Sequence, residues 1–145
     1  MKHLCKFCVS IAITLLISTF GTLSFAGGAG PLQQYFHLEP GLSDEEIEGL
    51  MFMREEEKVA RDVYTYFYEL YPVPIYDNIS RSEQWHMDQV LLLLNKYGLD
   101  DPVGSNGYGE FTDLDLQALY DYLIDIGSAD FISALYVGAL IEEVD

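Results

Sequence analysis

The chain has 145 residues, with 24 acidic and 7 basic side chains and a formal net charge of −17. So acidic a chain is repelled by the phosphate backbone, which excludes nucleic acid as a partner. Both cysteines, Cys5 and Cys8, precede the first long apolar run. The rest of the chain therefore has no disulfide, thiolate ligand or thiol nucleophile. Any metal there must bind oxygen and imidazole, which favours iron, manganese or zinc.

The first 26 residues are arranged like a secretory signal peptide. Two lysines precede an uncharged apolar run that reaches Phe20, and Ser24-Phe25-Ala26 has small residues at its outer positions. We predict cleavage after Ala26 and an exported protein, periplasmic or secreted. If the segment is not cleaved, it would be a membrane anchor, and it is the one contact with a membrane that we expect. Loss of the two lysines takes the net charge to −19.

Residues 27–41 are expected to form a linker and residues 42–145 one helical domain. Ser43 and Glu46 form a capping box that starts a helix over residues 44–71, which the prolines at 72 and 74 end. A second helix is expected over residues 76–97, ended by Gly98. The pattern predicts an all-α bundle.

The second half of the domain begins with a turn-rich loop over residues 99–111. A short helix, capped by Thr112 or Asp113, is expected to reach about residue 126, and a last helix to begin at Gly127-Ser128. This last helix is apolar nearly all round, which predicts an interior position in a bundle. No further helix follows it in the sequence, so we expect the bundle to lack its last long helix.

Two helical stripes place ionisable groups among apolar positions. Glu83 and His86 are three residues apart, so both side chains project from one helix face and could hold one metal ion. A buried, unpaired carboxylate costs several kcal/mol, so such groups are normally paired or bound to metal. The stripes consist of Leu50, Met53, Glu57, Ala60, Tyr64, Phe67 and Tyr71 in the first helix, and of Ile79, Glu83, His86, Val90, Leu93 and Tyr97 in the second.

A second interpretation of the same stripes needs no metal. In it, Glu57 pairs with Arg61 or Arg54, and His86 is a hydrogen-bonded core histidine. The helical spacing leaves both interpretations open. Trp85 lies beside the stripe, and we expect it to pack against the loop.

The sequence also gives expectations for four further glutamates. In the last helix, steps through Leu135 and Ala139 reach Glu142, whereas an equally apolar set through Tyr136 and Leu140 reaches Glu143. We favour Glu142 as the inward carboxylate. The adjacent pair of glutamates at 55 and 56 is expected to form a solvated helix face.

Three segments resemble an uncharacterised ferritin-like family, the DUF2202 domain. They are residues 50–64 (LMFMREEEKVARDVY), 79–88 (ISRSEQWHMD) and 137–145 (VGALIEEVD). The first also looks like the first metal-ligand helix of rubrerythrins. The resemblance implies a four-helix bundle with a di-iron or di-manganese centre. Carried over by motif, Glu57 would be the first carboxylate, Glu83 and His86 the first Glu-x-x-His pair, and Glu142 (or Glu143) the carboxylate of the third long helix.

The second Glu-x-x-His pair of that pattern has no counterpart in the sequence. The resemblance therefore implies either an incomplete domain or a homodimer that completes the bundle. The implied chemistry is that of a di-metal oxidase or peroxidase, or metal storage. Tyr64 could donate an electron, although a tyrosine on such a stripe is more often a core residue. Two alternatives remain: a non-enzymatic acidic interaction module that has lost the metal, and a buffer that binds cations weakly over its acidic surface.

Overall fold

A computed structural model describes residues 41–144, and this part of the chain is all-helical. It contains α2 (Asp44–Leu70), α3 (Pro74–Tyr97), α4 (Leu114–Gly127) and α5 (Phe131–Val144), with no strand among the described residues. The predicted helical bundle is confirmed. The predicted signal peptide, and all of the predicted linker but its last residue, lie outside the described residues. None of the helices in the described range is long and apolar enough to cross a membrane.

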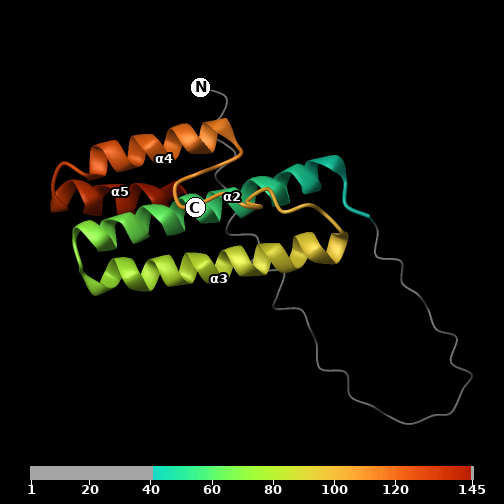
Figure 1. The fold of residues 1–145 in the computed structure, drawn as a ribbon, viewed down its shortest axis with the longest axis horizontal. Helices are drawn as coiled ribbons and strands as arrows, with labels where there is room; N and C mark the ends of the chain where they lie inside the picture. Colours follow the sequence, from blue (N-terminus) through green and yellow to red (C-terminus); the bar gives the residue numbers. More distant parts are fainter. Residues whose placement is uncertain (1–40, 145) are drawn as a thin grey trace, which may run out of the picture.

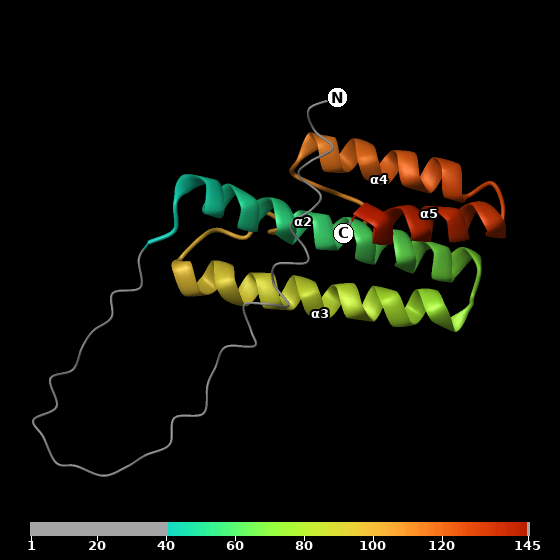
Figure 2. The same cartoon turned by 180° about the vertical axis from the view of Figure 1, so that it is seen from behind.

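The four helices form two hairpins (Figure 1). A short connection turns the chain from α2 into α3, so these two long helices run antiparallel and side by side. The shorter α4 and α5 pack against α2 on the side away from α3, and the opposite view shows the same order (Figure 2). Because it lies between α3 and the α4–α5 hairpin, α2 is the central helix.

The ends of the helices follow from local sequence. The Ser43 side chain accepts a hydrogen bond from the Glu46 N–H, and the Glu46 carboxylate accepts one from the Ser43 N–H, which confirms the capping box. Helix α3 begins at Pro74, two residues earlier than predicted, because proline is well suited to the first turn. Gly98 ends α3 with φ 67°, a conformation that glycine adopts without strain.

The connection between α4 and α5 differs from the prediction. Gly127 is the last residue of α4 and not the start of the next helix. A methyl group built at this position would overlap the Phe67 ring and approach Val137 to 3.1 Å. The glycine is therefore required by the close packing of α4 against α2 and α5.

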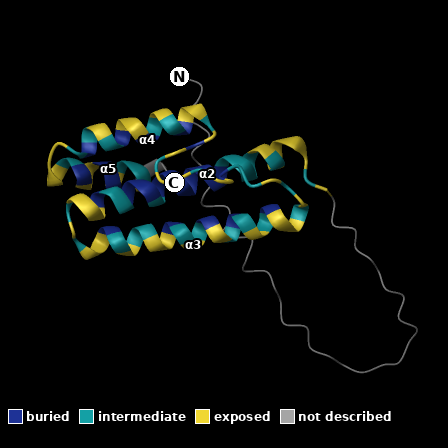
Figure 3. Ribbon diagram, viewed as in Figure 1, coloured by how far each residue is buried: buried dark blue, intermediate teal, exposed yellow. Residues whose placement is uncertain are grey.

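Burial is concentrated on α2 (Figure 3). Every residue from Met53 to Ala60 is buried, although this stretch contains five charged side chains. The largest core cluster lies further along α2, where aromatic and aliphatic side chains of all four helices meet. It includes Val63, Tyr64, Phe67, Tyr76, Leu116, Tyr120, Leu123, Ala134 and Val137.

Two expectations about buried faces were wrong. The last helix is not surrounded: Ile132 and Tyr136 on α5 are 72% and 61% exposed, because α5 contacts its neighbours with one face only. On α3 the buried stripe contains Met87 and Leu94, one position after the predicted His86 and Leu93. The small shift leaves His86 at the edge of the α2–α3 contact.

Candidate metal centre

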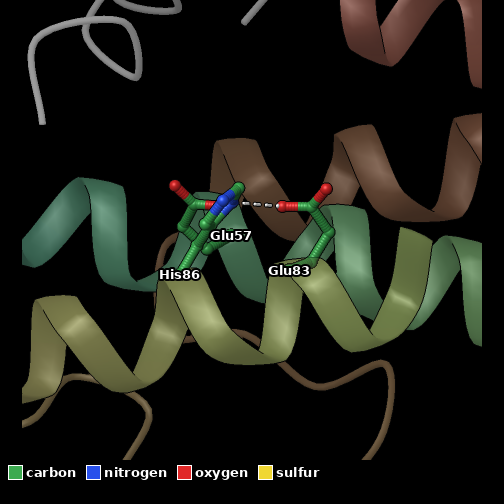
Figure 4. Close-up of side chains that lie close together, drawn as sticks. All are labelled: Glu57, Glu83 and His86. Atoms are coloured by element: carbon green, nitrogen blue, oxygen red, sulfur yellow. Dashed lines mark hydrogen bonds and ion pairs between the residues drawn. The ribbon is translucent and has the colours of Figure 1, made fainter. Parts of the chain in front are cut away.

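Glu57, Glu83 and His86 lie together between α2 and α3. One ligand atom from each residue can be chosen so that all three atoms lie within 4.8 Å of one another. The His86 Nδ1 atom is 2.8 Å from Oε2 of Glu83 and 3.3 Å from Oε2 of Glu57. The close-up shows Glu57 reaching across from α2 towards the pair on α3 (Figure 4). The structure thus brings together three of the four residues expected at a metal site.

The exposure of the three side chains is unequal. The side chains of Glu57 and Glu83 are buried, with 6% and 8% exposed, whereas that of His86 is 41% exposed. Trp85, the preceding residue, is also exposed, and its ring meets the His86 imidazole edge-on at 5.5 Å between centroids. Trp85 therefore packs against the imidazole. The cluster is buried at the carboxylates and open to solvent at the imidazole.

The two carboxylates strongly favour a positive charge between them. Hydrogen bonds with Glu57 and Glu83, reinforced by their negative charges, raise the pKa of His86 to about 10. Burial raises the pKa of Glu83, and the neighbouring Glu57 adds to this effect, although His86 opposes it. At neutral pH, the imidazolium therefore places one positive charge beside two close carboxylates.

Glu142 contacts Tyr64. Its Oε1 atom accepts a hydrogen bond of 2.8 Å from the Tyr64 hydroxyl, and the residue is exposed. It is not among the residues whose ligand atoms cluster in the described part of the chain. The side chain of the alternative residue, Glu143, lies outside the described residues.

The metal-free interpretation named two arginines as partners of Glu57, and both make other contacts. Arg54 forms two hydrogen bonds with the Asp101 carboxylate, at 3.1 and 3.0 Å. Arg61 forms an ion pair of 2.6 Å with Asp62. The structure places the imidazole of His86 beside Glu57.

Sequence reasoning missed a second set of buried charges, on the side of α2 that faces the loop after α3. We call Arg54, Glu55, Lys58 and Asp62 the loop-anchoring cluster. Lys58 Nζ donates to Asp62 Oδ2 and to the carbonyl of Gly107, both at 2.7 Å. Glu55 accepts hydrogen bonds from the backbone N–H groups of residues 112 and 113. The expected solvated face at 55 and 56 was wrong, since both glutamates are buried.

This error has a physical cause in the loop itself. A turn-rich segment cannot satisfy its own backbone groups, so it takes partners from a neighbouring element. Here the partners are charged side chains of α2. The sequence shows a run of charged residues in the first helix and, later, a loop rich in glycine. Neither pattern reveals that the two segments meet in the fold.

The donor set of Glu57, Glu83 and His86 fits one transition-metal ion. Carboxylate oxygen and imidazole nitrogen suit Fe²⁺, Mn²⁺ and Zn²⁺, and three protein ligands leave coordination positions for water or a substrate. A dinuclear carboxylate centre of the bundle type uses four carboxylates and two histidines. The residues that cluster in the described chain supply half of that set.

Comparison with known proteins places the chain beside uncharacterised relatives. Residues 46–145 match the family model described as "Uncharacterized protein domain (DUF2202)". The chain is 47% identical over 104 residues to "Uncharacterized protein MJ0754" of Methanocaldococcus jannaschii, a match that covers 72% of this chain and 56% of that protein. It also resembles the structure titled "Crystal structure of hypothetical protein MJ0754 from Methanococcus jannaschii", with 40% identity and a TM-score of 0.70, over 86% of this chain and 63% of that one. The chain thus spans less than two thirds of the length of the relatives it matches.

Proposed function

The chain belongs to the DUF2202 family, and from its geometry we propose that it binds one divalent iron or manganese ion at Glu57, Glu83 and His86. The observation that carries the proposal is the convergence of two buried carboxylates on one imidazole nitrogen. Burial of two like charges at short range is unfavourable unless a cation lies between them. A divalent ion offsets both carboxylates, which a single proton on the imidazole does not.

Each ligand has a distinct part in binding. Glu57 and Glu83 supply hard oxygen donors from a region with little water, where their attraction for a cation is strong. His86 supplies Nδ1, the nitrogen that faces both carboxylates, and must lose its proton to bind the metal. Because His86 is half-exposed, the ion can enter at the imidazole side. Such an ion could exchange electrons with dioxygen or peroxide through its open positions.

Metal analysis of the purified protein tests the proposal. The protein is loaded with Fe²⁺ without oxygen, or with Mn²⁺, passed through a desalting column, and analysed for bound metal. We expect about one ion per chain in the wild type and a large loss in Glu83→Ala and His86→Ala. Glu48→Ala is the control, because Glu48 is an exposed glutamate of α2, the helix that carries Glu57. A wild type that retains no metal, or variants that retain as much as the wild type, would contradict the proposal.

Two wider assignments belong to the same proposal. The helical bundle and the Glu-x-x-His pair support a relationship to ferritin-like proteins. A second metal ion would need ligands other than Glu57, Glu83 and His86. Residues 1–26 support export, because basic residues are followed by an apolar run and then by small residues at a cleavage site. Mass spectrometry of the protein from the producing cell tests export, and we expect a new N-terminus at Gly27.

One observation favours a second function, that of an acidic interaction module without metal. Residues 131–141 of α5 carry no charge, and Ile132, Leu135 and Tyr136 are exposed there. Two equally acidic copies of the chain could meet through such an uncharged face. This function predicts a folded, metal-free protein whose mass in solution is that of a dimer, and Leu135→Glu would convert it to a monomer.

A further inference from the structure

The two arginines of α2 lie on either side of Glu57, each about one helical turn away. Arg54 precedes Glu57 by three residues, and Arg61 follows it by four. Arg54 forms an ion pair with Asp101, and Arg61 forms one with Asp62. In both arginines, the carboxylate binds one edge of the guanidinium and leaves the Nη1 atom for another partner.

The Nη1 atom of Arg54 reaches the backbone of α3. The Nε and Nη2 atoms donate to the two oxygens of Asp101, at 3.1 and 3.0 Å, and this two-point contact fixes the plane of the guanidinium. Nη1 then donates to the carbonyl oxygen of Met87 at 2.9 Å, in a buried contact. A carbonyl oxygen within a helix can accept this further bond because it has two lone pairs. Met87 directly follows His86, so the bond lies beside one proposed ligand.

Arg61 repeats this arrangement on the other side of Glu57. Its Nε and Nη2 atoms donate to Oδ1 of Asp62, at 2.8 and 2.6 Å. Its Nη1 atom donates to Oε1 of Gln84 on α3, at 2.8 Å. Gln84 directly follows Glu83. Each arginine of α2 is therefore bonded to the residue that comes after one of the two proposed ligands of α3.

These bonds supply a precision that apolar packing does not. Met53, Val90 and Leu94 pack together between α2 and α3. Such contacts hold two helices together, but the hydrophobic effect is non-directional and fixes their relative rotation only weakly. Hydrogen bonds, by contrast, require a narrow range of distance and angle. Because binding groups must be held to within about 0.5 Å of the productive geometry, a metal site between two helices needs directional contacts close to its ligands.

We propose that Arg54 and Arg61 are positioning residues, which hold α3 in the rotation at which Glu83 and His86 meet Glu57. The proposal rests on the proposed function, because it concerns the geometry of that metal site. The aspartate that orients Arg54 belongs to the loop after α3. The loop and the metal site are thus connected through one guanidinium, and release of the loop lowers the affinity for metal.

Titration of the metal-free protein with Mn²⁺ tests this role. Arg54→Lys keeps the charge, but an ammonium group cannot contact Asp101 at two points and Met87 at the same time. Gln84→Ala removes the partner of Arg61 on α3. We expect both variants to bind Mn²⁺ about tenfold more weakly than the wild type, as found for residues that orient metal ligands. Gln89→Ala, which alters another half-buried glutamine of α3, is the matched control and should bind as the wild type does.

Circular dichroism at the temperature of the titration shows which variants are folded. If Arg54→Lys does not fold, Gln84→Ala alone decides the outcome. Wild-type affinity in every folded variant would overturn the positioning role. An effect on stability alone would lower the unfolding temperature and leave the affinity of the folded protein unchanged.

A measurement without metal separates this proposal from the metal site itself. In the wild type, Nδ1 of His86 lies 3.3 Å from Oε2 of Glu57, so we expect a nuclear Overhauser contact between the two side chains. This contact should be lost or weakened in Arg54→Lys and Gln84→Ala, and kept in Gln89→Ala. A wild type that binds no Mn²⁺, with variants that lose the contact, refutes the proposed function and supports the positioning role. A contact of equal strength in all folded variants shows that the positioning role is wrong.

Discussion

Helix α2 buries charged side chains on two of its faces, and the two sets differ in how their charges are balanced. In the loop-anchoring cluster, Arg54 meets Asp101, and Lys58 and Arg61 both meet Asp62. Between α2 and α3, by contrast, two carboxylates share one imidazole. The first set holds the loop against the bundle, whereas the second contains more carboxylate than cation. Burial of charge alone therefore does not mark a binding site, and the proposed metal site is supported by the excess of carboxylate beside an opening to solvent.

The largest expected effect on stability comes from removal of the cation in the loop-anchoring cluster. Lys58→Met leaves Asp62, which is fully buried, with the half-buried Arg61 as its remaining cation. Breaking a buried ion pair on one side costs about 3 kcal/mol, and urea unfolding of the metal-free protein measures it. Lys96→Met, at an exposed position, should change the free energy of unfolding by less than about 0.5 kcal/mol. A Lys58→Met protein as stable as the Lys96→Met protein would show that the cluster does not hold the loop.

A smaller effect is expected where the same cluster contacts backbone. Glu55→Gln replaces a carboxylate that accepts hydrogen bonds from the N–H groups of Thr112 and Asp113 with a neutral amide. Hydrogen bonds to charged groups contribute about 1.5–3 kcal/mol, so we expect a loss of about 2 kcal/mol. Amide hydrogen exchange at these two residues should accelerate, while exchange at the centre of α3 should follow only the global stability. Equal amide exchange rates at residues 112 and 113 in the wild type and in Glu55→Gln would show that Glu55 does not hold these N–H groups.

Removal of a charge from the Glu57–Glu83–His86 cluster should change the free energy of unfolding much less. Glu83→Gln in the metal-free protein removes one of two close carboxylates, and the relief of their repulsion offsets the weaker hydrogen bond to a half-exposed imidazole. We expect the free energy of unfolding to change by less than about 1 kcal/mol, with loss of metal binding. A loss as large as that of Lys58→Met would mean that this cluster, too, serves stability.

The smallest effect is a pH dependence that only the second cluster should show. The pKa of His86 is about 10 in the folded chain, above its ordinary value of 6.5. A group whose pKa is raised by folding stabilises the protein fully below the unfolded value, and this stabilisation is lost as the pH rises through the folded value. The stability advantage of the metal-free wild type over His86→Gln should therefore decline between pH 6.5 and 10. A constant difference over this window would show that His86 is not protonated between the carboxylates.

The fold was largely predictable because its signals are local. The capping box at Ser43, the prolines after α2 and Gly98 after α3 each act on neighbouring residues, and the structure has all of them. The boundary between α4 and α5 was predicted less accurately. The glycine at 127 is required by its close contact with Phe67, which lies sixty positions away in the sequence.

The candidate site was predictable in part, for the same reason. Glu83 and His86 are placed together by one turn of helix, and Glu57 by an antiparallel neighbour with a matching stripe. The contact of Glu142 with Tyr64 and the burial of Glu55 depend on how the second hairpin and the loop pack, which no periodicity encodes.

Calorimetric titration of the metal-free protein with Mn²⁺, in two buffers of different ionisation enthalpy at pH 7, tests the central claim most directly. The account predicts saturation near one ion per chain, with about one proton released as the imidazole gives up its hydrogen, and neither event in His86→Gln. Saturation without proton release, or heats that are identical in wild type and variant, would contradict it.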